Sequence, residues 1–415
     1  MASLPNRVTC CIAGGGPAGV MLGFLLARAG VEVLVLEKHR DFLRDFRGDT
    51  IHPSTLQVMH ELGLLDAFLA LPHQEVRELH GIVGDTEITL ADFSHLPTRC
   101  HFIAMMPQWD FLDFLARQGR HYPGFHVAMQ ADVTELIEHG GRIAGLRGEA
   151  PGGKFEVRAD LVIGADGRHS VVRERAGLKV MSLGAPIDVL WMRLSRRPGD
   201  PQETAGRING GRMLVTLDRG DYWQCAFVIR KDGFAAVQAR GLDKFREDIV
   251  AIAPFLRDRV EELRDWDDVK LLTVTVDRLE RWWRPGLLCI GDSAHAMSPI
   301  GGVGINLAVQ DAVAAANILA VPLRDGGLTD AHLAAVQRRR TLPTRLTQAM
   351  QVAIQQRVID PVLRSDAPLT APWPVRLFNR APLLARIPAR LIGMGVRPEH
   401  VHSPAIGSPA ALASV

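Results

Sequence analysis

The chain has 415 residues, and its 48 Lys and Arg against 46 Asp and Glu leave a formal net charge of +2. This balance argues against nucleic acid or an anionic membrane as a partner. The five cysteines include no Cys-x-x-Cys pair, which argues against a disulfide framework or a zinc site and predicts a cytoplasmic protein. No uncharged apolar run reaches about 18 residues, so no membrane-spanning helix is expected.

A strand, a glycine-rich turn, a helix and a second strand are predicted at the start of the chain. The apolar residues 8–13 predict a buried strand, and the glycines of residues 14–19 predict a turn. Residues 20–29 predict a helix that ends at Gly30, and residues 31–36 predict the second strand. This order is that of a βαβ unit.

The middle of the chain has a different pattern. A helix is expected over residues 111–118 and a short buried strand over 161–163. Residues of about 183–275 predict an antiparallel sheet, because β-branched and aromatic runs alternate there with polar turns. Its predicted strands are residues 189–194, 212–217, 223–229 and 271–276, and residues 80–93 are a candidate to join the same sheet.

The pattern then returns to alternating strand and helix. Residues 287–290 predict a buried strand, and residues 303–319 predict an Ala-rich helix. The chain after about residue 330 reads as mostly helical, with breaks expected at prolines. These prolines are Pro361, Pro368, Pro372, Pro374, Pro382 and Pro388.

The first motif is a G-x-G-x-x-G turn between the opening strand and its helix. It consists of Gly14, Gly15, Gly16, Pro17, Ala18 and Gly19. Gly14 permits the tight turn, Gly16 lets a pyrophosphate approach the backbone, and Gly19 lets the helix pack closely on the strand. The free N–H groups and the dipole at the helix N-terminus favour the diphosphate. Glu37 follows the second strand, where a carboxylate can accept hydrogen bonds from ribose hydroxyls.

Two further motifs separate FAD from NAD as the dinucleotide. Gly164-Ala165-Asp166-Gly167 follows one predicted strand, and Gly291-Asp292 follows another. A glycine-rich turn, residues 299–306, then leads into a helix whose N-terminus offers donors to a negatively polarised ring or to phosphate. Its glycines let a flat ligand lie against bare backbone. Asp292 can accept from a polyol chain, and a fold that binds only NAD needs neither element.

Together these motifs resemble those of the class A flavoprotein monooxygenases, the family of para-hydroxybenzoate hydroxylase, over residues of about 8–320. The resemblance implies that Gly14, Gly16, Gly19 and Glu37 hold the ADP half of FAD. It assigns Asp166 and Gly167 to a motif associated with both FAD and NAD(P)H, and Asp292 to the ribityl chain. The isoalloxazine ring would be lined by Pro299, Gly301, Gly302, Gly304, Ile305 and Asn306.

Four single residues extend the resemblance. Arg47 resembles the family's arginine near the flavin and pyrophosphate, and Gln108 resembles a glutamine that contacts FAD. Val133 corresponds to a backbone position beside the adenine, and Lys38, next to Glu37, joins the same cofactor set. A surface salt bridge for Arg47 and a cap at a helix start for Gln108 remain the alternatives.

The predicted fold class is α/β, with a Rossmann-like FAD-binding domain, an inserted antiparallel-sheet substrate domain and a helical C-terminal region. The FAD-binding domain is discontinuous and takes residues 1–75, 100–182 and 276–330. The substrate domain takes residues 76–99 and 183–275, and the C-terminal region takes residues 331–415. Because ligand sites favour domain interfaces, we expect the substrate between the flavin and the inserted sheet. Its candidate contacts are Trp191, Met192, Arg193, Arg212, Met213, Trp223 and Phe227.

The resemblance implies an NAD(P)H-dependent FAD monooxygenase. NADPH or NADH would reduce FAD, and O₂ would form a flavin C4a-hydroperoxide that transfers one oxygen to an aromatic or polycyclic substrate. Pro299, Gly301 and Gly302 would line that hydroperoxide site, with no side chain certain to be catalytic and no metal expected. A flavin halogenase or reductase on the same scaffold is one alternative, and a catalytically silent FAD-binding module is another. A monomer or a homodimer is expected.

Overall fold

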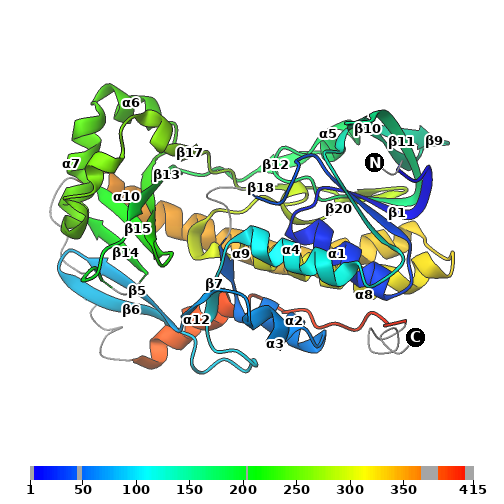
Figure 1. Cartoon of the computed structure of the whole chain (residues 1–415), viewed down its shortest axis with the longest axis horizontal. Helices are drawn as coiled ribbons and strands as arrows, with labels where there is room; N and C mark the ends of the chain where they lie inside the picture. Colours follow the sequence, from blue (N-terminus) through cyan, green and yellow to red (C-terminus); the bar gives the residue numbers. More distant parts are fainter. Residues whose placement is uncertain (1–3, 44–48, 202–203, 366–381, 407–415) are drawn as a thin grey trace.

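The computed structural model describes residues 4–43, 49–201, 204–365 and 382–406. Two large sheets lie towards opposite ends of the long axis of the molecule, and the long helix α9 runs from one towards the other (Figure 1). The first sheet contains the strands that carry the three sequence motifs. The second contains the strands of the middle of the chain, so the two parts that the sequence separates are also separate in space.

The first sheet has a parallel core in the order β20-β11-β1-β2-β8, with β19 antiparallel at one edge. β1 pairs in parallel with both β2 and β11, which places the first and second motifs on neighbouring strands. Residues 10–13 of β1 are at most 1% exposed, because helices cover both faces of such a sheet. The bounds are β1 Arg7–Ala13, β2 Val33–Glu37, β8 Phe125–Met129, β9 Asp132–His139, β10 Arg142–Ala150, β11 Gly153–Gly164, β19 Trp283–Arg284 and β20 Leu287–Cys289.

Four helices pack around this sheet: α1 Pro17–Arg28, α4 Gln108–Gly119, α8 Gly304–Arg324 and α9 Asp330–Ile354. α1 lies between α4 and α8 and contacts both. Residues 300–324 are long and apolar enough to cross a membrane by length and composition, yet 83% of the apolar window is buried inside the protein. Burial in the core therefore accounts for the apolar character of α8.

The second sheet has seven strands in the order β17-β13-β16-β15-β14-β5-β6. All neighbouring strands are antiparallel except β14 and β5. The predicted strands at 189–194, 212–217 and 223–229 are confirmed, and residues 80–93 do join this sheet. Its strands are β5 Glu78–Val83, β6 Thr86–Asp92, β13 Ile187–Ser195, β14 Ala205–Asn209, β15 Arg212–Asp218, β16 Tyr222–Arg230 and β17 Lys270–Leu272.

Short elements connect and cover the two sheets. β3, β4 and β7 form a small sheet of their own, and β12 pairs with β18. The strands are β3 Thr50–Ile51, β4 Gln74–Val76, β7 Ile103–Met105, β12 Val180–Ser182 and β18 Asp277–Leu279. The helices are α2 Pro53–Glu61, α3 Leu65–Leu69, α5 Val171–Arg175, α6 Phe234–Ala239, α7 Leu242–Ile252, α10 Asp360–Leu363 and α12 Arg386–Gly393. The short turns are η1 Pro254–Leu256, η2 Val260–Glu262, η3 Trp266–Asp268, η4 Gly291–Ser293, η5 Ile300–Gly302, η6 Gln355–Ile359 and η7 Pro382–Ala385.

Several expectations from the sequence are wrong. The reading of residues 183–275 as an antiparallel sheet misses α6 and α7. The charged residues of α7 resemble a polar turn in the sequence, and only the structure shows that its apolar face packs on the sheet. The strand predicted at 271–276 pairs only over β17. Pro361 does not break its helix, because a π-helical turn precedes it and it lies in the first turn of α10, where a missing N–H is tolerated.

The other prolines differ in outcome. Pro388 also lies in the first turn of a helix, α12, so the break predicted there is wrong for the same reason. Pro382 begins η7, which agrees with a helix boundary at this residue. Pro368, Pro372 and Pro374 lie outside the described residues.

Candidate flavin and substrate site

The three motif turns meet at one edge of the first sheet. β1, β11 and β20 are neighbouring parallel strands, with Ala13 paired to Gly164 and Gly164 paired to Cys289. A Cβ on Gly14 would lie 2.3 Å from the carbonyl oxygen of Ala165, so the first and second turns touch. A Cβ on Gly291 would lie 3.1 Å from the Cβ of Ala18, so the third turn touches α1. Turns far apart in the sequence therefore share one small region.

The glycines of the first turn have different environments. A Cβ on Gly19 would lie 2.0 Å from the carbonyl oxygen of Gly14, so the close packing of helix on strand excludes any side chain there. A Cβ on Gly16 would meet no heavy atom within 4 Å. Gly16 is the N-cap of α1, and the free N–H groups of the first turn adjoin this open space. The open space beside a positive helix end is of the kind a diphosphate requires.

Glu37 fixes the shape of this turn. It is 7% exposed, and its two carboxylate oxygens accept from the backbone N–H of Gly15 at 3.0 Å and of His39 at 2.9 Å. Lys38 beside it is exposed. The N–H of Ala131 donates to the carbonyl of Glu37 at 2.9 Å, which brings the chain leading to the buried Val133 beside the end of β2.

Asp166 of the second turn supports a helix. Its carboxylate accepts from the Ser170 hydroxyl at 2.5 Å and from the Val172 N–H at 3.0 Å, at the start of α5. Burial raises the pKa of Asp166 above its ordinary value. Gly167 adopts a left-handed φ of 84°, and the next residue, Arg168, reaches the third turn. Its Nη2 lies 3.8 Å from Oδ2 of the half-buried Asp292.

The glycine-rich turn before α8 is held by residues 50–55. The Thr50 hydroxyl donates to the carbonyl of Gly302 at 2.9 Å. The amide oxygen of Asn306 accepts from the His52 N–H at 3.0 Å and from the Thr55 hydroxyl at 2.7 Å. The buried Asn306 side chain thus anchors the turn.

The backbone of the same turn stays available to a flat ligand. Gly301 and Gly302 have φ values of 77° and 62°, a conformation that only glycine adopts without strain. Pro299 and Gly304 are half-buried, whereas Ile305 is buried. A Cβ on Gly304 would meet nothing within 4 Å, so open space also lies at the N-terminus of α8. The positive end of this 21-residue helix favours a negatively polarised group there.

The structure shows a polar cluster that the sequence analysis missed. Asp49, which precedes β3, forms a buried ion pair with Arg219 of the second sheet. The Nε of Arg219 donates to the side-chain oxygen of Gln224 at 3.1 Å. The Asp49 carboxylate also accepts from the backbone N–H of Gln108, and burial raises the pKa of Asp49 above its ordinary value despite these partners. Arg47 lies outside the described residues.

This cluster connects the two sheets through residues that no spacing pattern links. Gln108 is the first residue of α4, but the N-cap is Pro107 and no side chain caps the helix, so Gln108 is not the cap of the alternative. Asp49 accepts from the N–H of Gln108, and its only signal in the sequence is its position two residues after Arg47. Arg219 and Gln224 gave no signal in the sequence, since a turn arginine and a strand glutamine are common on exposed sheets.

Strand pairing divides the candidate substrate residues between two faces of the second sheet. Trp191 is opposite Ala226, Arg193 is opposite Gln224, and Met213 is opposite Val228, so these side chains share one face. We call it the open face and define it by Trp191, Arg193, Met213, Val215, Gln224 and Ala226. Met213 and Val228 pack with Ile300 of the glycine-rich turn, so this face borders that turn. The Arg193 guanidinium lies 3.9 Å from the centre of the Tyr222 ring.

The opposite face is covered by helices, and this corrects four of the candidates. Met192, Trp223 and Phe227 are buried in a cluster with residues of α7. The Trp223 ring N–H donates to Asp200 at 2.8 Å. Arg212 binds Asp248 of α7, with Nε to Oδ1 at 2.9 Å. None of these side chains lies on the open face, because alternate residues of a strand point to opposite faces of the sheet.

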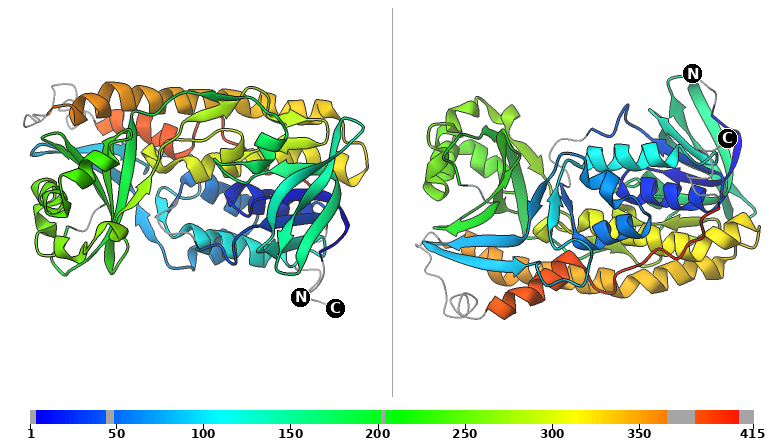
Figure 2. Two further views of the ribbon diagram at one scale, coloured as in Figure 1. Left: turned by 90° about the horizontal axis from the view of Figure 1, so that it is seen from above. Right: turned by 60° about the horizontal axis from the view of Figure 1, so that its bottom comes forward.

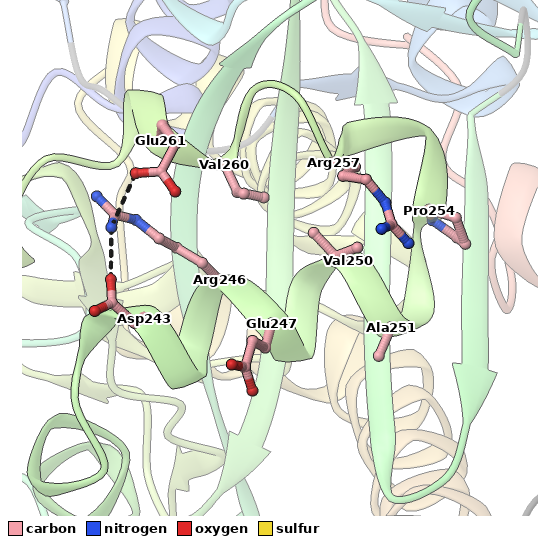
Figure 3. Close-up of a pocket in the computed structure, with 9 residues that line it drawn as sticks. All are labelled: Asp243, Arg246, Glu247, Val250, Ala251, Pro254, Arg257, Val260 and Glu261. Carbon is pink, nitrogen blue, oxygen red and sulfur yellow. Dashed lines mark hydrogen bonds and ion pairs between the residues drawn. The ribbon is translucent and has the colours of Figure 1, made fainter.

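An open groove lies on the outer surface of this helical cover, between α7 and the turns η1 and η2 (Figure 3). Arg246 crosses it and forms ion pairs with Asp243 at 2.7 Å and Glu261 at 3.0 Å. The groove is separated from the open face by α7 and the sheet. It is therefore not part of the candidate site. Within the described ranges, no group of three His, Cys, Asp or Glu side chains could hold a metal ion.

The comparisons with known proteins agree with this arrangement. Residues 7–350 match the family model described as FAD binding domain, so the chain belongs to that family. The chain is 33% identical over 383 residues to a 6-methylpretetramide 4-monooxygenase of Streptomyces rimosus, covering 92% of this chain and 91% of the relative. The protein is thus a member of the class A flavin-dependent aromatic monooxygenases, an FAD-dependent enzyme family.

Two solved structures share the fold. The probable FAD-dependent monooxygenase PqsL of Pseudomonas aeruginosa has a TM-score of 0.73 at 22% identity, covering 86% of this chain and 99% of that one. The anhydrotetracycline hydroxylase OxyS of Streptomyces rimosus has a TM-score of 0.74 at 23% identity, covering 97% of this chain and 78% of that one. At these identities the likeness concerns the fold alone.

Proposed function

We propose that this protein uses NADPH or NADH and O₂ to insert one oxygen atom into an aromatic or polycyclic substrate, with FAD bound across the three turns. The observation that carries the proposal is the meeting of those turns beside open space at Gly16 and Gly304. Ile300 of the adjoining glycine-rich turn packs with Met213 and Val228 of the second sheet, which supports a substrate on the open face. The flavin, when bound, supplies the chemistry of oxygen activation, and the chain supplies position and exclusion of water.

The chain's own groups have distinct proposed roles. The N-terminus of α1, from Gly16 to Gly19, binds the diphosphate, and Glu37 accepts from the adenosine ribose. Asp292 accepts from the ribityl hydroxyls, with Arg168 nearby to orient its carboxylate. Lys38, Arg47, Gln108 and Val133 remain in the proposed cofactor set, as do Asp166 and Gly167. The ring is proposed to lie against Pro299, Gly301, Gly302, Gly304 and Ile305, together with the backbone of Asn306.

The division of labour follows the two sheets. We assign residues 1–75, 100–182 and 276–330 to FAD binding, and residues 76–99 and 183–275 to the substrate. The motivation is that the three turns lie on the first sheet and that the open face belongs to the second. The helices after residue 330 are proposed to support both, because α9 runs beside both regions (Figure 2).

The open face suggests a flat, mainly apolar substrate with an oxygen substituent. Its centre is formed by Trp191, Val215 and Ala226, which pack together. At one end the exposed Arg193 can meet a phenolate or carbonyl oxygen. 6-Methylpretetramide, named in the relative at 33% identity, is a polycyclic compound suited to a first test.

The test combines cofactor content with turnover. We expect the purified protein to carry FAD, to oxidise NADPH or NADH faster when 6-methylpretetramide is added, and to release a product heavier by one oxygen atom. An unchanged rate of NAD(P)H oxidation with this and related polycyclic phenols would favour the silent FAD-binding module. A halogenated product in the presence of halide would favour a halogenase, although the sequence contains no Trp-x-Trp-x-Ile-Pro segment.

A further inference from the structure

Four charged or ionisable side chains form a continuous buried chain behind the Gly291-Asp292 turn. His295 is 1% exposed, Asp311 0%, Arg340 1% and Glu399 5%. We call them the buried charge chain. They come from four separate segments, namely the end of the third motif, α8, α9 and the C-terminal segment. A buried charge is costly unless it is paired, so each member depends on its neighbours.

Asp311 holds the turn itself. Its Oδ2 accepts from the backbone N–H of Gly291 at 3.0 Å and lies 2.5 Å from Nε2 of His295. One carboxylate oxygen thus fixes both the residue before Asp292 and a residue three positions after it. Interactions with His295 and Arg340 hold the pKa of Asp311 below its ordinary value in spite of burial. The position of the Asp292 carboxylate depends on this anchor.

Arg340 connects Asp311 to the C-terminal segment. Its Nε donates to Oδ1 of Asp311 at 2.8 Å, and its Nη1 donates to Oε1 of Glu399 at 3.3 Å. Arg339, on the solvent side, donates to the same oxygen of Glu399 at 2.7 Å. The guanidinium of Arg340 is therefore held between two carboxylates. Loss of either charge would leave Arg340 partly uncompensated in the core.

The segment that carries Glu399 lies along the flavin-binding elements. Residues 397–406 run past α2 and α8 to the end of α1 (Figure 1). The N–H of Glu399 donates to the side chain of Gln310 in α8. Beyond it, Glu61 of α2 binds Nδ1 of His400 at 2.6 Å and the N–H of Val401 at 2.8 Å. Two carboxylates therefore anchor the segment, but only Glu399 also contacts Arg340.

We propose that Glu399 is a positioning residue for the flavin site, which acts through Arg340 and Asp311 on the Gly291-Asp292 turn. This inference rests on the proposed function for the cofactor role of Asp292. The alternative is that Glu399 only anchors the C-terminal segment, as Glu61 does. The two roles predict different results, because an anchoring role alone predicts that removing either carboxylate has the same effect on the Gly291-Asp292 turn.

The matched pair Glu399→Gln and Glu61→Gln separates these roles, since each change keeps the volume and removes one anchoring charge. We expect Glu399→Gln to raise the FAD dissociation constant about tenfold, the size of one lost charge-assisted contact. It should also change the visible circular dichroism of the bound flavin and speed amide exchange in residues 291–295 of the cofactor-free protein. Glu61→Gln should loosen residues 400–403 and leave all three measurements at the wild-type values.

Equal effects of the two variants on FAD affinity and on exchange at residues 291–295, or no effect of Glu399→Gln, would overturn the inference. If Glu399→Gln does not fold, the shorter Glu399→Asp and Glu61→Asp are compared in the same way, with the same expected order. A wild-type protein without affinity for FAD would contradict the proposed function instead, because amide exchange tests the link from Glu399 to the turn without cofactor.

Discussion

The three motif turns meet at one edge of the first sheet, which we call the flavin edge after the proposed cofactor. This edge and the open face of the second sheet are built on different principles. At the flavin edge the backbone defines the site, through open space at Gly16 and Gly304 and through helix ends that offer N–H groups. On the open face the side chains define it, and strand parity decides which of them point towards the flavin. A backbone site fixes a cofactor of constant shape, whereas a side-chain surface determines which substrate fits.

The largest expected effect comes from filling the open space at the flavin edge. Gly16→Val places a branched side chain where a diphosphate would lie, and its Cβ would point into open space, with no neighbouring heavy atom within 4 Å. The variant should therefore fold normally and lose FAD almost completely, by more than about 100-fold in affinity. Flavin absorbance after purification and titration with FAD measure this loss.

The control for Gly16→Val is Gly152→Val. Gly152 also has open space beyond its α-carbon, but it lies in the exposed turn before β11. This variant should retain FAD at the wild-type level. If Gly16→Val binds FAD as well as Gly152→Val does, the flavin edge does not hold the diphosphate and the comparison between the two regions collapses.

The stability of the contacts around the glycine-rich turn should fall as the pH falls. His52 is buried beside the glycine-rich turn, its Nδ1 lies 2.7 Å from the carbonyl oxygen of Ile392, and burial lowers its pKa to about 4. Between pH of about 6.5 and 4 the unfolded chain binds more protons at this site, so stability falls as pH falls. The loss at pH 4 is about 3 kcal/mol from His52 alone.

Denaturant unfolding at several pH values isolates this contribution. His52→Asn keeps a donor for the Ile392 carbonyl and removes the titration, so its stability should fall less steeply below pH of about 6.5. The exposed His139→Asn serves as control and should show the wild-type slope. If the free energy of unfolding of His52→Asn falls with pH as steeply as that of the wild type, then protonation of His52 does not contribute to the pH dependence of stability.

The smallest expected effects distinguish the two faces of the second sheet. Trp191→Ala, on the open face, should raise the dissociation constant of 6-methylpretetramide about tenfold with FAD content unchanged. Trp223→Phe, on the helix-covered face, should leave that constant unchanged. It should lower the free energy of unfolding by about 1 kcal/mol, because the hydrogen bond to Asp200 is lost. The reverse pattern would mean that the substrate lies on the covered face.

The sequence predicted the flavin edge better than the open face for a physical reason. Gly14 and Gly19 are required by close backbone approaches and Gly291 by its left-handed φ of 61°, so their spacing alone reveals the turns. Trp191 and Trp223 lie on neighbouring strands, and nothing in the alternation tells which face borders the glycine-rich turn. Only α7, whose apolar face packs against Trp223, decides it, and the sequence analysis missed that helix.

The polar contacts between distant segments could not be predicted, because no spacing pattern links their partners. Asp49 and Arg219 are distant in sequence, and so are Asp311 and Glu399, so only the folded chain joins them. Asn306 was predicted from its motif, but its anchoring role depends on His52 and Thr55, which the motif does not contain. The motifs therefore predicted where the turns lie, whereas the contacts that hold the turns in place required the structure.

We infer that FAD at the first sheet activates O₂ and that one of its oxygen atoms passes to a substrate on the open face. Turnover of 6-methylpretetramide under ¹⁸O₂, with NADPH or NADH and the FAD-loaded protein, tests this inference. We expect a product that carries one ¹⁸O atom, with less of it formed by Trp191→Ala at limiting substrate. A product without ¹⁸O, or NAD(P)H consumption that yields only hydrogen peroxide with every polycyclic phenol tested, would contradict it.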